Sequence, residues 1–494
     1  MTDTPDRIQR IVIAGGGTAG WMTAAALSQT LGKQLNITLV ESDAIGTVGV
    51  GEATIPTLQY FHRLLGIDEQ EFMAATQATF KLGIEFVNWR HTGHKYIHAF
   101  GHTGQDCWAC GFQHFWLKGQ QLGIAHDYGD YCPEHQAAAT ERFAHTQPSN
   151  LNYAYHLDAG NYARYLRHFS EQRGVKRIEG TISDVAINPG TGNIDSLTLS
   201  QGEIVRGDLF IDCTGFRGRL IEQALHTGFE DWSHWLPCDR AIAVQSEHSH
   251  QPLPYTRSIA QPHGWQWQIP LTGRQGNGVV YASNTISDAD AEDQLLSGLQ
   301  AAPLTEPKRI SFRTGKRRKQ WHKNCVAIGL SSGFLEPLES TSIHLISSAI
   351  LRLLDFFPLN GIKRSEIHEF NKQAELELIG IRDFVILHYK VTQRRDSPLW
   401  QYCQQMTVPD TLQEKLELFA QTGRVLKERN ELFEDSWQQV MLGQGLQPEA
   451  YHPIVNNMND DELSRFLTQI RQQIANRVAQ LPHHLDYLRH YVNR

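Results

Sequence analysis

The chain has 494 residues, of which 40% are hydrophobic and 20% are charged, as is usual for a globular protein and unlike a disordered one. A formal net charge of -8 argues against a general nucleic-acid binder, and no uninterrupted apolar run is long enough to span a membrane. The seven cysteines are scattered without the pattern of a disulfide framework, which favours a reducing cytoplasm.

A glycine motif near the N-terminus separates a predicted strand from a predicted helix. Residues 8–14 are an apolar run typical of a buried strand, and residues 21–31 are an Ala-rich helix. Between them, Gly15 permits a tight turn, Gly17 lets the backbone approach a pyrophosphate, and Gly20 lets helix and strand pack closely. This order predicts a dinucleotide-binding site but does not by itself separate FAD from NAD.

An acidic residue follows the glycine motif at the expected distance. The second predicted strand, residues 36–40, ends at Glu41, 21 residues after Gly20, where an acid that binds a ribose hydroxyl is expected. The Gly-rich segment 46–54 then either wraps the cofactor or is a flexible connection. The residues of this region predicted to bind the cofactor are Gly15, Gly17, Thr18, Ala19, Gly20, Glu41, Gly51 and Ala53.

Lys81 is flanked by apolar residues on both sides in the sequence. It follows Phe80 and precedes the apolar segment 82–87, so its ammonium is a candidate for desolvation and chemical tuning. The ordinary alternative is that the side chain extends until the ammonium reaches solvent. Further on, His98 and Phe100 are candidates for lining an aromatic substrate pocket.

A cysteine and histidine pattern in the same region offers a possible zinc set. Cys107-x-x-Cys110 is followed by Cys132-x-x-His135, and such spacings occur in zinc sites. The flanking sequence lacks the other features of a zinc ribbon. We therefore favour buried structural cysteines and predict no metal.

The middle of the chain is predicted to form a helix, a further strand and an antiparallel sheet. Residues 153–172 are expected to be helical, and residues 208–215 form another strand that ends in a small Gly turn. Residues 241–312 alternate apolar and polar positions, which predicts an antiparallel sheet. Trp265 and Trp267 are two residues apart in that sheet and share one face, where ordinary packing is the alternative role.

The densest cluster of signals lies between residues 325 and 343. An apolar run, residues 325–328, reads as a buried strand, and Pro337 indicates a helix that begins at about Glu339. Residues 340–342 would then offer N–H groups and hydroxyls at the helix start, which is a ready anion site. Glu339 places a carboxylate beside that anion site. The alternative is a capped helix after a tight turn.

The C-terminal part is predicted to be mostly helical from residue 346 onward. A loop-like stretch, residues 436–453, interrupts it and contains Trp437. We predict one large domain over residues 1–395 and a helical subdomain over residues 396–494 that packs on it.

Taken together, these segments resemble the flavin-dependent tryptophan halogenases over nearly the whole chain. The resemblance implies an α/β fold: a Rossmann-type FAD-binding domain like that of flavin monooxygenases, an antiparallel substrate sheet and a helical C-terminal region. The matching motifs are Gly15-x-Gly17-x-x-Gly20-Trp21, Phe80-Lys81, Trp265-x-Trp267-x-Ile269-Pro270 and Phe334-x-x-Pro337-Leu338-Glu339-Ser340-Thr341-x-Ile343.

The resemblance also implies a reaction and its partners. Reduced FAD, delivered as a co-substrate by a separate flavin reductase, would react with dioxygen and a halide ion to give hypohalous acid. That acid would halogenate a small electron-rich aromatic, most plausibly an indole compound or tryptophan. The enzyme would act as a monomer or homodimer, without nucleic acid or membrane. The alternatives are an FAD-dependent hydroxylase with its own NADPH site and a non-catalytic FAD-binding or zinc-stabilised protein.

The resemblance assigns roles to particular residues. The halide would lie near the N–H groups of Thr341 and Ser342. Lys81 would hydrogen-bond the hypohalous acid or form a haloamine with it, and Glu339 would polarise the halogen donor or accept the ring proton. Many relatives have Gly where this chain has Ser342. The added Cβ leaves the choice between chloride and bromide open, and bromide is the less tightly hydrated of the two ions.

The remaining implied residues surround the cofactor and the substrate. Trp265 and Trp267 would fill the space beside the flavin, so that the substrate could not reach it and be hydroxylated. Leu330 would join the cofactor site. The predicted tunnel and pocket residues are Trp265, Trp267, Ile269, Pro270, His98, Phe100 and Trp437.

Overall fold

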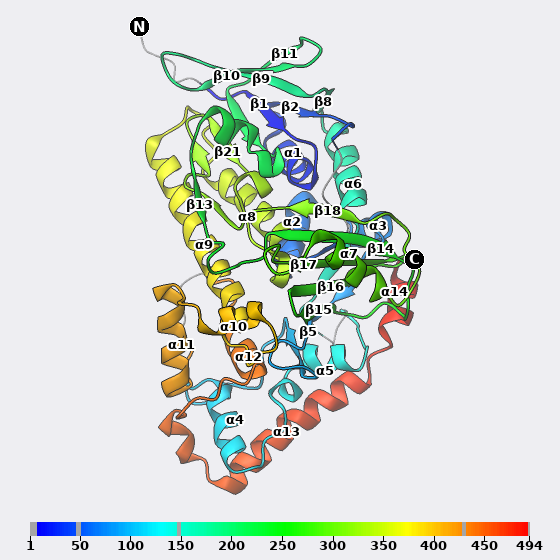
Figure 1. Cartoon of the computed structure of the whole chain (residues 1–494), viewed down its shortest axis with the longest axis vertical. Helices are drawn as coiled ribbons and strands as arrows, with labels where there is room; N and C mark the ends of the chain where they lie inside the picture. The colour runs from blue at the N-terminus through cyan, green and yellow to red at the C-terminus, as the bar shows by residue number, and fades with distance from the viewer. Residues whose placement is uncertain (1–6, 46–50, 146–149, 427–430, 493–494) are drawn as a thin grey trace. The chain divides into compact units, whose positions relative to one another are not determined.

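The computed structural model describes residues 7–45, 51–145, 150–426 and 431–492 (Figure 1). The chain divides into two compact units that each combine three segments. The first unit is Met1–Ala78, Leu157–His234 and Ile310–Leu378, and the second is Thr79–His156, Trp235–Arg309 and Ile379–Arg494. The expected boundary near residue 395 stays a prediction.

The first unit is built on a mostly parallel sheet. Its central strand is β1 (Arg10–Ala14), which pairs in parallel with β2 (Asn36–Glu41) on one side and β12 (Leu209–Asp212) on the other. Because sequence order reverses across β1, the carboxyl end of this strand is the switch point where such sheets bind ligands. The other strands of the sheet are β8 (Lys176–Glu179), β20 (Trp321–His322) and β21 (Cys325–Ala327).

Helices pack against this sheet, and α1 (Thr18–Leu31) contacts both α6 (Ala159–Glu171) and α8 (Ser342–Asp355) (Figure 1). The helix predicted over residues 153–172 is partly wrong, because its first residues form β7 (Ala154–Leu157). The unit's other elements are β3 (Glu52–Ala53), α2 (Thr57–Leu65), α3 (Glu69–Thr76), β9 (Ile182–Ile187), β10 (Ile194–Leu199), β11 (Ile204–Arg206), β13 (Phe229–Asp231), β19 (Gly315–Arg317) and β22 (Gly333–Phe334).

The second unit is built on a seven-stranded sheet in the order β18-β14-β17-β16-β15-β5-β6. The pairs β14–β17, β17–β16, β16–β15 and β5–β6 are antiparallel, and β15 pairs with β5 in parallel. The antiparallel sheet predicted over residues 241–312 is therefore confirmed. The strands are β5 (Gly83–Val87), β6 (Lys95–Ala99), β14 (Arg240–Ser246), β15 (Thr256–Gln261), β16 (Gly264–Pro270), β17 (Gln275–Tyr281) and β18 (Lys308–Ser311). A separate short strand, β4 (Thr79–Lys81), pairs with β7.

The predicted helical C-terminal region is confirmed, and in it α13 (Asp460–Ala479) buries one stripe of apolar side chains against α4 (Phe112–Gln121) and α5 (Pro133–Ala139). The loop expected over residues 436–453 is wrong at its start, where α12 (Trp437–Gly443) forms. The remaining helices are α7 (Asp288–Ser297), α9 (Arg364–Lys390), α10 (Pro398–Gln405), α11 (Asp410–Thr422) and α14 (His484–Val492).

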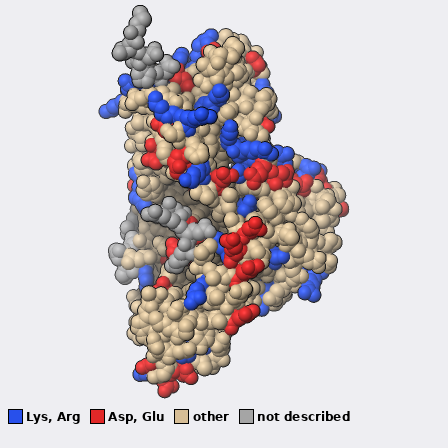
Figure 2. Space-filling model, turned by 90° about the vertical axis from the view of Figure 1, so that its left-hand side faces the viewer, with Lys and Arg blue, Asp and Glu red and all other residues tan. Residues whose placement is uncertain are grey.

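Two surface properties complete the description. Of the helices that the structure describes, none is both long and apolar enough to cross a bilayer. On the face drawn in Figure 2, Lys and Arg side chains lie close to Asp and Glu side chains, so charges of both signs are mixed there.

Candidate functional site

The glycine motif forms the turn between β1 and α1. The reason why glycine is required differs from one position of the motif to the next. Gly15 has φ +106°, and a Cβ on it would lie 2.3 Å from the carbonyl oxygen of Cys213. A Cβ on Gly20 would lie 1.9 Å from the carbonyl oxygen of Gly15. A Cβ on Gly17, by contrast, would meet nothing within 4 Å among the described residues.

That open space lies at the start of α1, whose N-cap is Gly17 and which no side chain of the described ranges caps. The first N–H groups of a helix are unsatisfied within the helix and favour an anion. The turn therefore has the room and the donors to hold a pyrophosphate, with the backbone of Thr18 and Ala19 at the helix start.

Glu41 lies at the end of β2, beside this turn. One carboxylate oxygen accepts a hydrogen bond from Trp21 Nε1 at 3.4 Å, and the other accepts one from Arg177 Nε at 2.6 Å. A Cβ on Gly16 would collide with the Glu41 carboxylate, so that carboxylate lies directly against the glycine turn. A carboxylate can accept about four hydrogen bonds, and Glu41 thus has capacity left for a ribose hydroxyl.

Replacing Gly17 by Ala tests the cradle directly. Because the protein itself leaves the Cβ position open, we expect the melting temperature to be unchanged. The methyl group would occupy the space of the pyrophosphate, so the Kd for FAD should rise about 10-fold or more, equivalent to ~1.4 kcal/mol. Fluorescence titration and thermal unfolding measure the two quantities. Gly20→Ala is the contrasting variant, because it should lower the melting temperature, and an unchanged Kd in Gly17→Ala would contradict the assignment.

A second turn lies against the start of α1. It is the single turn η4 (Gly329–Ser331), which follows β21 and contains the predicted residue Leu330. A Cβ on Gly329 would lie 2.8 Å from the Cβ of Ala19, so the two turns are in direct contact. The Ser331 hydroxyl donates to the carbonyl oxygen of Ile328 at 3.1 Å. The sequence identified Leu330 only through the resemblance, whereas the packing of Gly329 on Ala19 gives it a physical reason.

The Gly-rich segment is described only in part, because residues 46–50 lie outside the described ranges. Gly51 has φ +136°, and Ala53 is buried in β3. Between them lies the half-buried Glu52, and removal from water raises the pKa of its carboxyl to about 7. The sequence alone did not indicate a role for Glu52, because the partial burial of its side chain depends on the tertiary structure.

The anion site is predicted at the start of a helix, and that helix begins later than expected. Residues Pro337–Glu339 form a single 3-10 turn, η5, and Ser340 has φ +59°, a left-handed conformation that no regular helix contains. The helix α8 starts at Ser342, with Thr341 as its N-cap and without a side-chain cap among the described residues. Glu339 and Thr341 are each 1% exposed. A buried, uncapped helix start beside a carboxylate is suited to a small anion such as a halide.

Lys81 ends β4, in the second unit, and is 0% exposed. The alternative that its ammonium reaches solvent is therefore wrong. Its Nζ lies 5.1 Å from the ring centroid of Phe100, a distance at which a cation is attracted to the ring face. Lys81 pairs with Ala154 in the β4–β7 ladder, so the position of its backbone is fixed by two strands.

A buried histidine ties the Lys81 strand to its neighbours. The Thr79 hydroxyl donates to the carbonyl oxygen of Pro270 at 2.7 Å and lies 2.8 Å from His156 Nδ1. Since the Thr79 proton is used on Pro270, Nδ1 of His156 donates and Nε2 accepts from Thr256, at 3.0 Å. Burial first, and then the Lys81 charge, hold the pKa of His156 well below its usual range. His156 is thus a neutral connector between strands. The sequence did not indicate this role, because residues 153–172 were expected to form a helix and His156 lies in β7.

Replacing His156 by Leu should therefore act in two ways. The buried hydroxyls of Thr79 and Thr256 would each lose a partner, at roughly 1–3 kcal/mol per group, so the free energy of unfolding should fall by about 2–6 kcal/mol in a urea titration. The strand that carries Lys81 would also loosen, so a reaction that depends on the Lys81 amine should slow down as well. His156→Asn, which keeps hydrogen-bonding capacity, should restore part of both. Equal stability in His156→Leu and the unmodified protein would contradict the connector role.

The two tryptophans of β16 share a face as predicted, with ring centroids 6.1 Å apart. Trp267 pairs across the ladder with Gly278, and a Cβ there would lie 2.0 Å from the Trp267 ring, so glycine makes room for the indole. Ile269 and Pro270 are also buried. Because Pro270 accepts from Thr79, this strand is bonded to the Lys81 strand.

Trp437 is fully buried in α12, and its ring is 5.0 Å from that of Phe384 in an edge-to-face arrangement. The ring of His98 is 5.7 Å from the same Phe384. The Gln439 side chain joins α12 to the β6 edge, because it accepts from the Ala99 N–H at 3.0 Å and donates to the Gly101 carbonyl at 3.0 Å. An aromatic cluster thus forms at the edge that leads to Phe100.

The predicted residues therefore assemble into two groups. The first unit holds the cofactor and anion residues: Gly15, Gly17, Thr18, Ala19, Gly20, Glu41, Gly51, Ala53, Leu330, Glu339, Thr341 and Ser342. The second unit holds the aromatic and amine residues: Lys81, His98, Phe100, Trp265, Trp267, Ile269, Pro270 and Trp437.

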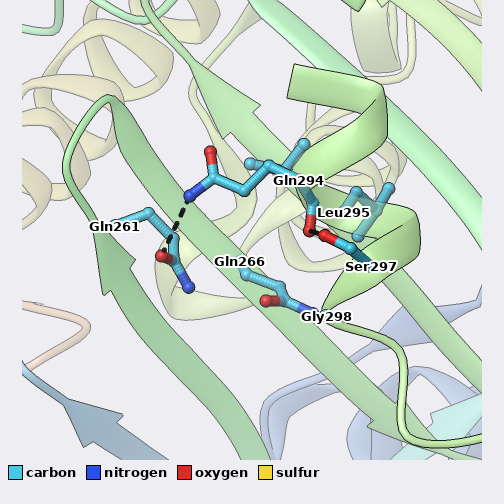
Figure 3. A pocket seen from close by; sticks show the side chains of 7 residues that line it. Gln261, Gln266, Gln294, Leu295, Ser297 and Gly298 are labelled. Carbon is cyan, nitrogen blue, oxygen red and sulfur yellow. Dashed lines mark hydrogen bonds between the residues drawn. The ribbon is translucent and has the colours of Figure 1, made fainter. Parts of the chain in front are cut away.

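A separate hollow of about 200 Å³ lies between α7 and the sheet of the second unit (Figure 3). Side-chain amides line it, and Gln294 Nε2 donates to Gln261 Oε1 at 3.5 Å. Gln266 lies between Trp265 and Trp267 in β16, so its side chain points to the opposite face of the strand. None of the described residues that line this hollow belongs to the predicted site.

The cysteine and histidine pattern does not assemble into a metal site. Within the described ranges, no three side chains of His, Cys, Asp or Glu come together in a way that would hold a metal ion. Cys132 Sγ lies 3.6 Å from a Glu134 oxygen, while Cys107 and Cys110 face each other across a tight turn.

Comparison with known proteins gives one consistent result. The chain matches the family described as tryptophan halogenase over residues 10–460. It is 34% identical to the tryptophan 7-halogenase RebH of Lentzea aerocolonigenes, over 98% of each chain. Its structure resembles those of two flavin-dependent halogenases, Xcc4156 from Xanthomonas campestris (56% identity, TM-score 0.97, 98% of each chain) and BrvH from Brevundimonas sp. BAL3 (46% identity, TM-score 0.94, 98% of this chain and 99% of that one).

Proposed function

Because the chain belongs to the tryptophan halogenase family, we propose that this flavin-dependent halogenase places a halogen on the ring of an indole compound or of tryptophan. It uses FAD and a halide, and it requires a separate flavin reductase. When bound, reduced FAD supplies the electrons with which dioxygen converts halide into hypohalous acid. The glycine turn and Glu41 fit this cofactor, since they combine an open helix start with a ribose-binding acid. The hydroxylase alternative is not favoured.

The halide is held at the start of α8 in this proposal. Glu339, Ser340 and Thr341, which lead into this helix start, are buried, so few water molecules would compete there for an anion bound by the N–H groups of Thr341 and Ser342. The helix dipole adds a favourable interaction of roughly 0.3–1 kcal/mol. Because these donors are part of the backbone, they are in place before the halide arrives.

The observation that carries the proposal is the complete burial of Lys81 beside an aromatic ring and two bonded strands. There the Lys81 amine holds the electrophilic halogen, through a hydrogen bond to hypohalous acid or as a haloamine. The indole ring attacks the halogen and then loses a proton. Glu339, also buried, accepts that proton or polarises the halogen donor. His156 keeps the Lys81 strand in register.

Product analysis by mass spectrometry tests the proposal. The purified protein is incubated with FAD, NADH, a flavin reductase and either indole, tryptophan or a phenol, with chloride or bromide in parallel. We expect a mono-halogenated indole or tryptophan that is absent when the reductase is omitted. An oxygenated product would replace the proposal by the hydroxylase. NADH oxidation by the protein without the reductase would do the same.

The halide site gives a further prediction through Ser342. Ser342 adds a Cβ and a hydroxyl that glycine lacks at the helix start, and in this proposal bromide, which gives up its bound water more easily than chloride, is the ion better accommodated there. In Ser342→Gly we expect the ratio of chlorinated to brominated product to rise by about 5-fold, equivalent to ~1 kcal/mol, when both halides are supplied at equal concentration. Ser348→Ala, in the same helix, should leave the ratio unchanged. An unchanged ratio in Ser342→Gly would remove this side chain from halide selection.

We further propose that the enzyme acts in the cytoplasm as a monomer or homodimer. All seven cysteines lie in the described ranges, and all carry free thiols, which supports a reducing compartment. Size-exclusion chromatography with light scattering tests the oligomeric state.

A further inference from the structure

The segment Cys107-Trp108-Ala109-Cys110 forms a two-residue hairpin. The Cys107 N–H donates to the Cys110 carbonyl at 3.1 Å, and the Cys110 N–H donates to the Cys107 carbonyl at 2.9 Å. Trp108 and Ala109 have φ values of 51° and 57°, so both turn residues are left-handed, as in a type I′ turn. Neither is the Asn or Gly that such a turn usually takes, and the Phe112 N–H, which donates to Asp106 at 2.9 Å, closes the base of the hairpin.

This turn brings the two thiols together. Residues that exchange both backbone hydrogen bonds have Cα atoms about 5.5 Å apart and side chains on the same side of the ladder. Disulfides require a Cα separation of about 4.4–6.8 Å. The pair is therefore within reach of a disulfide bond without a change of fold, although both thiols are free in this structure.

The two cysteines differ in access. Cys107 is half-buried, whereas Cys110 is buried, and burial raises the pKa of the Cys110 thiol to about 11. A small solute therefore reaches the Cys107 thiol before the Cys110 thiol, which lies deeper. Trp108, at the tip, is 48% exposed and presents an indole, the same kind of ring that the enzyme is proposed to halogenate.

We propose that Cys107 and Cys110 are a modification site at which hypohalous acid that leaves the active site is reduced and a disulfide is formed. The proposal rests on the proposed function, because that reaction supplies the oxidant. The pair would consume escaped oxidant before it reaches the exposed indole of Trp108.

The reaction has two steps. The Cys107 sulfur attacks the halogen of hypohalous acid, so that an S–halogen bond forms, the O–halogen bond breaks, and water leaves with the thiol proton. The Cys110 sulfur then attacks the Cys107 sulfur, so that the S–S bond forms, halide leaves, and the second thiol proton passes to solvent. The dithiol loses two electrons and the halogen gains them, which needs no further reagent.

The first test adds the oxidant directly. Reduced protein without FAD receives one equivalent of hypobromite, remaining thiols are alkylated, and the digest is analysed by mass spectrometry. We expect the peptide with residues 107–110 to be lighter by two hydrogen atoms and to resist alkylation. Cys238 and Cys325, both buried, are internal controls that stay reduced. Alkylation of both hairpin thiols after the treatment would overturn the proposal.

The second test uses turnover. The enzyme works with bromide, FAD, NADH, the reductase and catalase, but without an aromatic substrate, and parallel samples receive indole or tryptophan to show that halogenation proceeds. We expect the disulfide to depend on bromide, and Cys107→Ser/Cys110→Ser to gain bromine on Trp108. If brominated indole or tryptophan forms while the hairpin stays reduced and Trp108 stays unmodified in both proteins, the modification site is wrong. Absence of a brominated product both with indole and with tryptophan in the parallel samples would instead refute the proposed function.

Discussion

Lys81→Met is expected to lower the rate of aromatic halogenation by about 10³-fold or more while the enzyme still converts halide into hypohalous acid. The amine is the group proposed to hold the electrophile, and a positioned acid or base contributes about 10²–10⁴-fold to a rate. Methionine keeps the length and apolar character of the stem, so the fully buried position of Lys81 stays filled. Halogenated product and trapped hypohalite are measured in the same reaction.

A second buried lysine provides the control. Lys118 lies in α4 of the same unit, and its Nζ donates to the Met458 carbonyl at 2.8 Å. Lys118→Met removes a comparable charge from another part of the unit and should leave the partition between product and hypohalite unchanged. Full product formation in Lys81→Met would remove Lys81 from the mechanism. Loss of both product and hypohalite would mean that Lys81 acts earlier, in the step that forms hypohalous acid from halide.

Glu339→Gln is expected to lower the rate of product formation by about 10²-fold or more without a change in the Kd for FAD. Glu339 is 1% exposed, at the end of η5 beside the start of α8. Glutamine keeps the shape and can still hydrogen-bond, so the variant removes the charge and the proton-accepting oxygen alone. The rate is measured by product analysis with saturating reductase, and the Kd by fluorescence titration.

A deuterated indole separates the two roles proposed for Glu339. If this carboxylate accepts the ring proton, the variant should make deprotonation limiting and produce a kinetic isotope effect. If it polarises the halogen donor, the rate should fall without one. Glu375→Gln is the matched control, since Glu375 is a carboxylate of the same unit that accepts from Lys316 at 2.8 Å, and it should keep full activity. Full activity in Glu339→Gln would exclude both roles.

The nucleotide cradle was predictable because it is made by contiguous residues. A strand, a turn and a helix in succession fix where the N–H groups of the helix start point. Gly15 and Gly20 are each required by a close contact within the same unit, whereas a Cβ on Gly17 would meet nothing there. Glu41 is likewise placed by the length of one helix and one strand. The proposed anion site at Thr341 and Ser342 was predictable for the same reason, since a helix start carries its own donors.

The local sequence pattern predicted helix boundaries wrongly at two places in the chain. Pro337 indicated a helix that begins at about Glu339, but residues Pro337–Glu339 form a separate 3-10 turn, Ser340 adopts a left-handed conformation, and α8 begins only at Ser342. In the same way, residues 154–157 pair with β4 instead of continuing the helix of α6. Propensity averaged over a window does not resolve such changes, because the neighbouring strand decides them.

The sequence by itself determined the class of this protein: a dinucleotide cradle, an anion-binding helix start with its carboxylate, a lysine in apolar surroundings and a pair of tryptophans on one strand face. Only the tertiary structure decided that Lys81 is buried, that His156 is a neutral connector, and that α12 is attached to the β6 edge by Gln439. The physical reason is sequence separation. The groups that bury Lys81 and bond to His156 come from segments up to about two hundred residues apart in the chain, and their meeting depends on packing that no local pattern contains.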